Sequence, residues 1–222
     1  MPRALVALVA VLALLVTEDA VAGPPTDQLR RSIDRVMKLV GDPAGRREPI
    51  RERRAPLRKI ADDIFDWGET AKRSLGMHWR ERTPAEREEF VRLFGDLLEH
   101  AYITKIEGYS GEKILYAGEI EDGDQAVVKT RIVTKQDTTI PVDYRMLRKG
   151  ERWRAYDVYI EGVSLVANYR SQFNAIIQRT GYPDLVTKLR AKQDERPGAR
   201  ETGRREEVTV PVSAQPPRIQ TP

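Results

Sequence analysis

The feature that most constrains the fold is a change in hydrophobic period near the middle of the chain. Up to Ile106, apolar residues recur every three or four positions, as on one face of an amphipathic helix. Between Ile114 and Ile160 they recur at a period of two, which is typical of strands. After Gly162 the helical period returns. Helices, strands and helices in that order predict an α+β fold with helices gathered on one sheet.

The helical segments have recognisable ends. The first follows a Thr26–Asp27 cap and covers residues 29–40, and the second covers 50–65. Thr83-Pro84-Ala85-Glu86 is a capping box, and an apolar stripe runs from Phe90 to Ile106 behind it. After the strands, a helix over residues 165–177 stops at Thr180–Gly181, and a short last helix carries Leu185 and Leu189. We therefore expect several amino-terminal helices and two carboxy-terminal ones.

Four strands are predicted, over residues 114–120, 126–134, 140–147 and 153–160. The connections between them are short, polar and contain turn-forming residues, as in hairpins. The strands should therefore form an antiparallel meander, curved under the helices.

These strands are apolar on both sides. In the last strand Trp153, Ala155 and Tyr159 alternate with Tyr156, Val158 and Ile160, and in the first strand Ile114, Tyr116 and Ile120 oppose Leu115 and Ala117. One layer of helices covers the apolar side chains on only one face of a sheet. The other face needs a second helical layer, a partner chain or a bound apolar ligand, and periodicity alone does not separate a filled core from a cavity that a ligand fills.

If a ligand fills the space, an apolar cavity should lie between the sheet and the helices, because ligand pockets are concave and mostly apolar. The residues expected to line it come from both halves of the chain: Phe94, Leu97, Leu98, Tyr102, Tyr116, Val128, Ile132, Val142, Tyr144, Tyr156, Val158, Ile160, Val166 and Phe173.

The two ends of the chain are expected to lie outside the folded domain. Residues 1–22 have a basic start, an apolar run from Ala4 to Val16 and a small-residue cleavage site, which together predict a secretory signal peptide. Residues 191–222 are rich in Pro, Arg and Glu and predict a disordered tail. Residues 24–190 would then form a single domain of a soluble, exported protein in a bacterial periplasm, without cysteine and therefore without disulfides.

Little in the sequence indicates bond-making chemistry. The only histidines, His78 and His100, lie in separate helical segments, so we expect no metal site, and no motif predicts a cofactor. Ser164, in Gly162-Val163-Ser164, stands where a nucleophile elbow would place its serine, but a helix N-cap explains it better. Asp157 and Glu161 on one strand face could form an acid/base pair, or equally a solvated strand edge or a partner for Arg170.

Basic residues crowd the segment 46–59. They are Arg46, Arg47, Arg51, Arg53, Arg54, Arg58 and Lys59, with Glu48 and Glu52 among them. This is typical of a solvated helix face, or of a docking patch for a membrane complex or anionic lipid headgroups. The net charge of +4 is small and the chain is expected to be exported, so nucleic acid is not an expected partner.

The carboxy-terminal part of the domain resembles a known family. Two stretches are similar in order and spacing to the MlaC/toluene-tolerance family: Asp143-Tyr144-Arg145, and Trp153 to Phe173. The second stretch contains Tyr156-Asp157-Val158, Gly162-Val163-Ser164-Leu165 and Asn168-Tyr169-Arg170-Ser171-Gln172-Phe173. The likeness spans roughly residues 27–190. Within this range the amino-terminal half is unusually rich in arginine. It implies a periplasmic lipid-binding protein and no enzyme.

The resemblance also implies partners. It predicts a carrier, expected to be a monomer, that shuttles phospholipid between an outer-membrane lipoprotein complex and an inner-membrane ABC transport complex. A hopanoid is the alternative cargo within the family. Two other hypotheses stay open: a small-molecule enzyme on a similar scaffold, and an assembly subunit whose second apolar face pairs with another chain.

Overall fold

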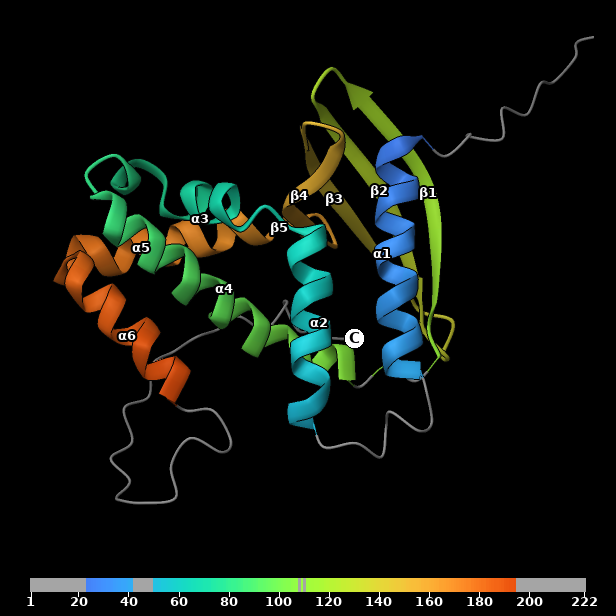
Figure 1. Ribbon diagram of the computed structural model, residues 1–222, viewed down its shortest axis with the longest axis horizontal. Helices are drawn as coiled ribbons and strands as arrows, with labels where there is room; N and C mark the ends of the chain where they lie inside the picture. The colour runs from blue at the N-terminus through green and yellow to red at the C-terminus, as the bar shows by residue number, and fades with distance from the viewer. Residues whose placement is uncertain (1–22, 42–49, 108, 110, 195–222) are drawn as a thin grey trace, which may run out of the picture.

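The computed structural model describes residues 23–41, 50–107, 109 and 111–194, which form helices packed around and beside one antiparallel sheet (Figure 1). The predicted signal peptide and most of the predicted tail lie outside these residues. The last helix, α6 (Tyr182–Asp194), continues past the predicted domain boundary at 190.

The helices of the first half form where the sequence predicts them, with one addition. They are α1 (Pro24–Gly41), α2 (Ile50–Ile64) and α4 (Pro84–Glu107), and α1 begins before the predicted Thr26–Asp27 cap. The addition is α3 (Trp67–Leu75), followed by the 3₁₀ turn η2 (Gly76–Trp79). Asp66 caps α3 by accepting a hydrogen bond from the Glu69 N–H at 2.9 Å.

The predicted capping box of α4 is confirmed. The Thr83 N–H donates to the Glu86 carboxylate at 2.7 Å, and the Glu86 N–H donates to the Thr83 hydroxyl at 3.2 Å. Hydrogen bonds that the Thr83 backbone and side chain make to the carboxylate hold the pKa of Glu86 below its usual value.

The sheet has the order β1-β2-β3-β4-β5, and all neighbours are antiparallel. The four predicted strands are β1 (Lys113–Asp122), β2 (Gln125–Val133), β3 (Thr139–Lys149) and β4 (Arg152–Ile160). The prediction of four is one short, because the two-residue strand β5 (Val163–Ser164) folds back on the end of β4. We call the face that carries Ala126, Val128 and Met146 the inner face, and the opposite one the outer face.

A bulge in β4 corrects the predicted division of its residues between two faces. Arg145 lies opposite Asp157, but the next residue, Met146, lies opposite Ala155, so Tyr156 is an extra residue in the ladder. An extra residue inverts the alternation beyond it. Trp153 and Ala155 therefore share the inner face with Val158 and Ile160, and the strand presents one apolar face rather than two.

A bulge in β1 also inverts the alternation, and here it moves an apolar residue to the outer face. Tyr116 lies opposite Thr130 and Gly118 lies opposite Lys129, which leaves Ala117 as the extra residue. Ile120 was predicted on the side of Ile114 and Tyr116, and this is wrong: it pairs with Val127 on the outer face and is 55% exposed.

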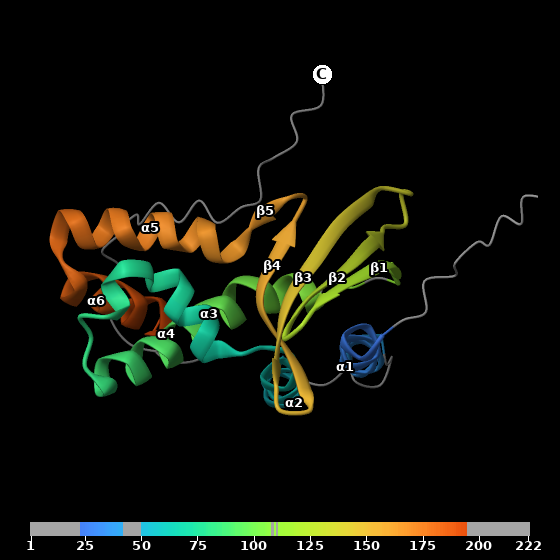
Figure 2. The ribbon, with the colours of Figure 1, turned by 90° about the horizontal axis from the view of Figure 1, so that it is seen from above.

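The inner face is covered by the amino-terminal helices. Leu29 and Ile33 of α1 and Ile60 and Ile64 of α2 pack into one cluster with apolar residues of the sheet, which are Ala126, Val128, Met146, Trp153 and Ala155. Figure 2 shows α1 and α2 side by side on this face of the strands. The helical residues predicted to face the sheet came instead from the segments 94–102 and 166–173.

The remaining helices form a second core beside the sheet. Residues of α3, α4, α5 (Leu165–Thr180) and α6 pack together around Phe90, Phe94, Tyr169 and Phe173, whose rings contact each other. Figure 2 shows this helical group on one side of the strands, with α5 reaching the sheet at β4 and β5. The described residues therefore pack mainly into two large apolar cores, and both contact β4.

A buried carboxylate joins these two parts. Asp157 was predicted as a solvated edge residue or a partner for Arg170, but it is only 6% exposed. It accepts hydrogen bonds from the Val158 N–H (2.8 Å), the Ser164 hydroxyl (2.6 Å) and the Val166 N–H (3.0 Å). Glu161 instead lies in the exposed turn after β4, so the imagined acid/base pair is not formed.

Candidate functional site

The inner face of the sheet divides into a closed end and an open end. At the closed end Ala126, Val128, Met146 and Ala155 are at most 3% exposed beneath α1 and α2. Towards the other ends of the same strands, the inner face carries large apolar and aromatic side chains that are only half-buried: Ile114, Tyr116, Ile132, Ile140, Tyr144, Val158 and Ile160. We call these seven residues the open end.

Buried small residues form the floor between the side chains of the open end. Val142 is 4% exposed and Thr130 is 2% exposed, and the Thr130 hydroxyl donates to the Val142 carbonyl at 2.7 Å. Thr130 therefore satisfies its hydroxyl within the sheet and presents no free polar group. An apolar surface of this kind favours hydrocarbon over water.

The two phenols of the open end are neutral at physiological pH. Burial raises the pKa of Tyr144 to about 12. Burial also raises the pKa of Tyr116, and the neighbouring Asp34 carboxylate and Tyr144 raise it further. The Tyr116 hydroxyl is buried and has no hydrogen-bond partner among the residues that the structure describes. A buried hydroxyl without a partner is costly and uncommon, and either a water or a ligand atom can satisfy it.

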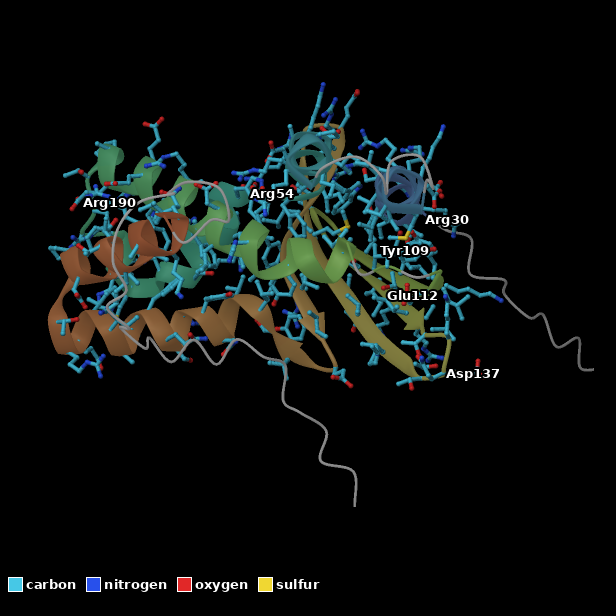
Figure 3. The ribbon with its side chains drawn as sticks, turned by 90° about the horizontal axis from the view of Figure 1, so that it is seen from below. Arg30, Arg54, Tyr109, Glu112, Asp137 and Arg190 are labelled. Atoms are coloured by element: carbon cyan, nitrogen blue, oxygen red, sulfur yellow. The ribbon has the colours of Figure 1, made fainter. Side chains whose placement is uncertain are left out.

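Helix ends border the open end. Val40 of α1 and Leu57 of α2 are buried in a small cluster, with Ile106 of α4 and Tyr109 packed against them. Figure 3 shows Tyr109 close to α1 and beside the end of α4. The carboxy-terminal end of α4 therefore meets the two helices that cover the sheet, while the rest of α4 packs mainly on α3 and α6.

Arg58 fixes the position of α4 relative to α2. Its guanidinium lies 2.8 Å from Asp96 and 2.5 Å from Glu99, both of α4. Burial alone would lower the pKa of Arg58, but the hydrogen bonds and charges of the two carboxylates raise it above its ordinary value. In the Arg-rich segment, then, this residue has a structural role. Arg46 and Arg47, and the side chains of Arg51 and Arg53, lie outside the part that the structure describes.

The structure brings together most of the predicted residues from the sheet. Seven of them share the inner face: Tyr116, Val128, Ile132, Val142, Tyr144, Val158 and Ile160. Tyr156 does not join them, because the bulge turns it towards α3. There its ring lies under the Arg73 guanidinium at 4.1 Å, and its carbonyl accepts from the Thr70 hydroxyl.

The predicted residues from the helices lie elsewhere. Phe94, Leu97, Leu98, Tyr102 and Phe173 belong to the helical core, where the rings of Phe94 and Phe173 meet edge to face at 5.2 Å. Val166 is buried in the first turn of α5, where its N–H bonds to Asp157. The contacts described for these side chains are therefore with the helical core and, for Val166, with Asp157.

One charged residue beside the open end was not predicted from the sequence. The Arg30 guanidinium of α1 lies 4.5 Å from the centre of the Tyr116 ring. Helical periodicity indicates only that Arg30 follows a buried Leu29. It does not indicate the contact of Arg30 with Tyr116, which lies far along the chain.

A surface groove lies away from the open end. It runs between the start of α3 and α4 and is lined by Arg58, Trp67, Ala85, Glu88, Glu89, Val91 and Arg92. Two of its charges are already paired, Arg58 as above and Glu89 with Arg190 of α6. This groove therefore offers fewer free charged groups to a ligand than its lining residues suggest.

The other chemical groups have structural surroundings. Ser164 is the N-cap of α5, as predicted, with its hydroxyl accepting from the Ala167 N–H at 2.9 Å. His78 forms a hydrogen bond with Asn174. Within the described ranges, no three His, Cys, Asp or Glu side chains are grouped so that they could hold a metal ion. None of the described helices is both long and apolar enough to span a membrane.

One family model and two curated proteins are similar to this chain. A protein-family model described as "MlaC protein" matches residues 30–191. The "Intermembrane phospholipid transport system binding protein MlaC" of Haemophilus influenzae is 27% identical over 80% of this chain and 86% of its own length. The "Toluene tolerance protein ttg2D" of Pseudomonas putida is 24% identical over 56% of this chain and 59% of its own length.

A solved structure shares the fold. It is a phospholipid-binding protein from Ralstonia solanacearum in complex with a phospholipid, with a TM-score of 0.66 and 23% identity. The match covers 75% of this chain and 95% of the other.

Proposed function

This chain belongs to the MlaC family, and from that premise we propose that it binds a phospholipid and carries it through the bacterial periplasm. Two comparisons support the cargo: the Haemophilus relative is named as a phospholipid transport system binding protein, and the Ralstonia structure holds a phospholipid. The observation in this chain that carries the proposal is the open end of the sheet, where seven large apolar and aromatic side chains share one face and stay half-buried.

The physical task of such a carrier is to shield hydrocarbon. Transfer of one CH₂ group out of water is worth about 0.8 kcal/mol, so roughly thirty acyl methylenes disfavour the aqueous phase by about 24 kcal/mol. A lipid that crosses an aqueous compartment must therefore stay covered. Tyr116, Ile132, Tyr144, Val158 and Ile160 offer the cover, and the neutral phenols add no charge against the acyl chains.

Exchange with a membrane should be nearly balanced. Lipid tails already lie in hydrocarbon in a bilayer, so moving them to an apolar site changes their free energy little. The direction of transport would then be set by partners, and we propose an outer-membrane lipoprotein complex and an inner-membrane ABC transport complex as those partners. A hopanoid is the alternative cargo, because it is also a membrane lipid with a large apolar surface that must be shielded from water.

The lining that we propose consists of the sheet residues on the inner face. The predicted contribution of Phe94, Leu97, Leu98, Tyr102, Val166 and Phe173 from the helices stays a prediction.

The test is direct measurement of bound lipid. The full chain is purified from bacteria without detergent and extracted with organic solvent, and the lipid is identified and counted by mass spectrometry. Near-stoichiometric phospholipid supports the proposal, and hopanoid in its place would replace phospholipid as the cargo. Repeatedly empty, dimeric preparations would instead favour the assembly-subunit hypothesis.

A matched pair of variants assigns the site. Ile132→Lys places a charge in the open end, whereas Ile120→Lys makes the same change on the exposed outer face. We expect Ile132→Lys to lose most of its lipid and Ile120→Lys to keep it, with circular dichroism confirming that both fold. Equal lipid content in the two variants would show that the open end is not the site.

A further inference from the structure

Arg30 occupies a particular position at the border of the open end. It follows Leu29, which is 1% exposed against the sheet, and its own side chain is exposed. The guanidinium lies over the ring of Tyr116 with 4.5 Å between its central carbon and the ring centre. Figure 3 shows Arg30 on the flank of α1. One face of the cation is therefore covered by an aromatic ring of the open end.

The charge of Arg30 has no acidic partner in the described ranges, whereas Arg35 on the same helix is paired with Asp63 at 3.0 Å. A guanidinium stacked on a ring still has N–H groups along its edge that can donate hydrogen bonds. The planar fork of these donors fits phosphate oxygens, and charge-assisted bonds of this kind are strong. Stacking also restricts the side chain, so less freedom is lost when an anion binds.

Tyr116 links this cation to the apolar surface. Its ring is part of the open end, and its hydroxyl is buried without a partner among the described residues. An acyl chain packed on the inner face beside Tyr116 would have its polar end within reach of Arg30. Resting on the lipid-carrier function proposed above, we propose that Arg30 binds the phosphate of the bound phospholipid, with the Tyr116 ring holding the guanidinium in place.

Asp34 limits which headgroups fit. It is exposed one helical turn after Arg30, and its carboxylate acts on the same phenol, since it raises the pKa of Tyr116 after the larger effect of burial. A second negative charge on the headgroup would be repelled by Asp34, whereas a neutral or cationic substituent would not. The site therefore suits a phosphodiester whose remaining headgroup carries no further negative charge.

The experiment compares lipids with and without phosphate. The full chain, stripped of lipid, is equilibrated with pelletable vesicles of dioleoylphosphatidylcholine, or with the same vesicles containing dioleoylglycerol, and protein-bound lipid is counted in the supernatant. Arg30→Ala removes the proposed phosphate ligand. Arg31→Ala removes the same charge from the neighbouring position, which is also exposed and lies about 100° around the helix. Arg30→Lys keeps the charge but not the planar fork.

We expect Arg30→Ala to weaken phosphatidylcholine binding about tenfold, to leave dioleoylglycerol binding unchanged, and Arg31→Ala to behave as wild type. Arg30→Lys should fall between Arg30→Ala and wild type. Asp34→Asn should improve the binding of dioleoylphosphatidic acid, which carries additional negative charge. The proposal is overturned if Arg30→Ala and Arg31→Ala lose equal affinity, or if Arg30→Ala weakens both lipids alike. Those results would leave the carrier function standing, whereas a wild-type chain that takes up neither lipid would refute both.

Discussion

Asp157 should contribute more to stability than any other single carboxylate described above. It is 6% exposed, and its two oxygens accept three hydrogen bonds from Val158, Ser164 and Val166. The first donor lies in β4, the second in β5 and the third at the start of α5. Replacing Asp157 with Ala would leave these donors without their acceptor at the junction between the sheet and the helical core.

The size of the effect follows from these three bonds. A net contribution of about 1.5–3 kcal/mol is usual for hydrogen bonds to a charged group, and an unpaired buried donor costs about 1–3 kcal/mol. Partial relaxation and water entry reduce the sum, so we expect Asp157→Ala to lower the free energy of unfolding by about 4 kcal/mol. Asp157→Asn keeps one acceptor oxygen and should cost about 1–2 kcal/mol.

Urea unfolding followed by circular dichroism and tryptophan fluorescence measures these differences. With a slope of about 2 kcal/mol per molar urea, Asp157→Ala should shift the midpoint down by about 2 M. Asp143→Ala on β3 is the control, since Asp143 is half-buried on the outer face and should shift the midpoint little. The reasoning is refuted if Asp157→Ala unfolds within 0.3 M of wild type (roughly 0.6 kcal/mol at that slope), or if Asp157→Asn is as destabilising as Asp157→Ala.

Three further predictions concern other parts of the chain. Burial raises the pKa of Tyr144 to about 12 in the folded chain, so its contribution to stability is complete below pH 10 and is lost as the pH rises towards 12. The urea midpoint should therefore fall less between pH 9 and pH 11 in Tyr144→Phe than in wild type, and an equal fall in both would contradict this. Thr83→Ala removes the hydroxyl of the α4 capping box and should cost about 1 kcal/mol in thermal unfolding, with Thr83→Ser close to wild type as the control. Arg58→Ala leaves the carboxylates of Asp96 and Glu99 without their shared cation and should lower the free energy of unfolding by about 1–2 kcal/mol, which Arg58→Lys recovers only in part. If the loss disappears in the Asp96→Asn background, the ion pair with Asp96 accounts for it.

The helix ends were predictable because their causes are local. Thr83 and Glu86 are three residues apart, and the reciprocal bonds between them need no other part of the chain. Ser164 was likewise placed correctly as the cap of α5. Asp66, which caps α3 through Glu69, carries the same kind of local signal and could have been found.

The candidate site was only partly predictable. Alternation correctly grouped Val128 and Ile132 on one face of β2, because no bulge interrupts the ladder between β2 and β3. It failed for Tyr156, because the sequence does not show where a strand gains an extra residue. The contact between Arg30 and Tyr116 joins residues far apart in the chain, so neither residue reveals it alone.

The sequence by itself determined the order of helices and strands, the hairpin connections and the capped helix ends, since each depends on residues within a few positions of one another. Only the tertiary structure decided which helices cover the inner face, which residues the bulges in β1 and β4 turn outward, and where the apolar surface stays half-buried. The physical reason is that register and helix packing are set by contacts between distant segments. One extra residue in a strand inverts every side chain beyond it without changing the composition of the chain.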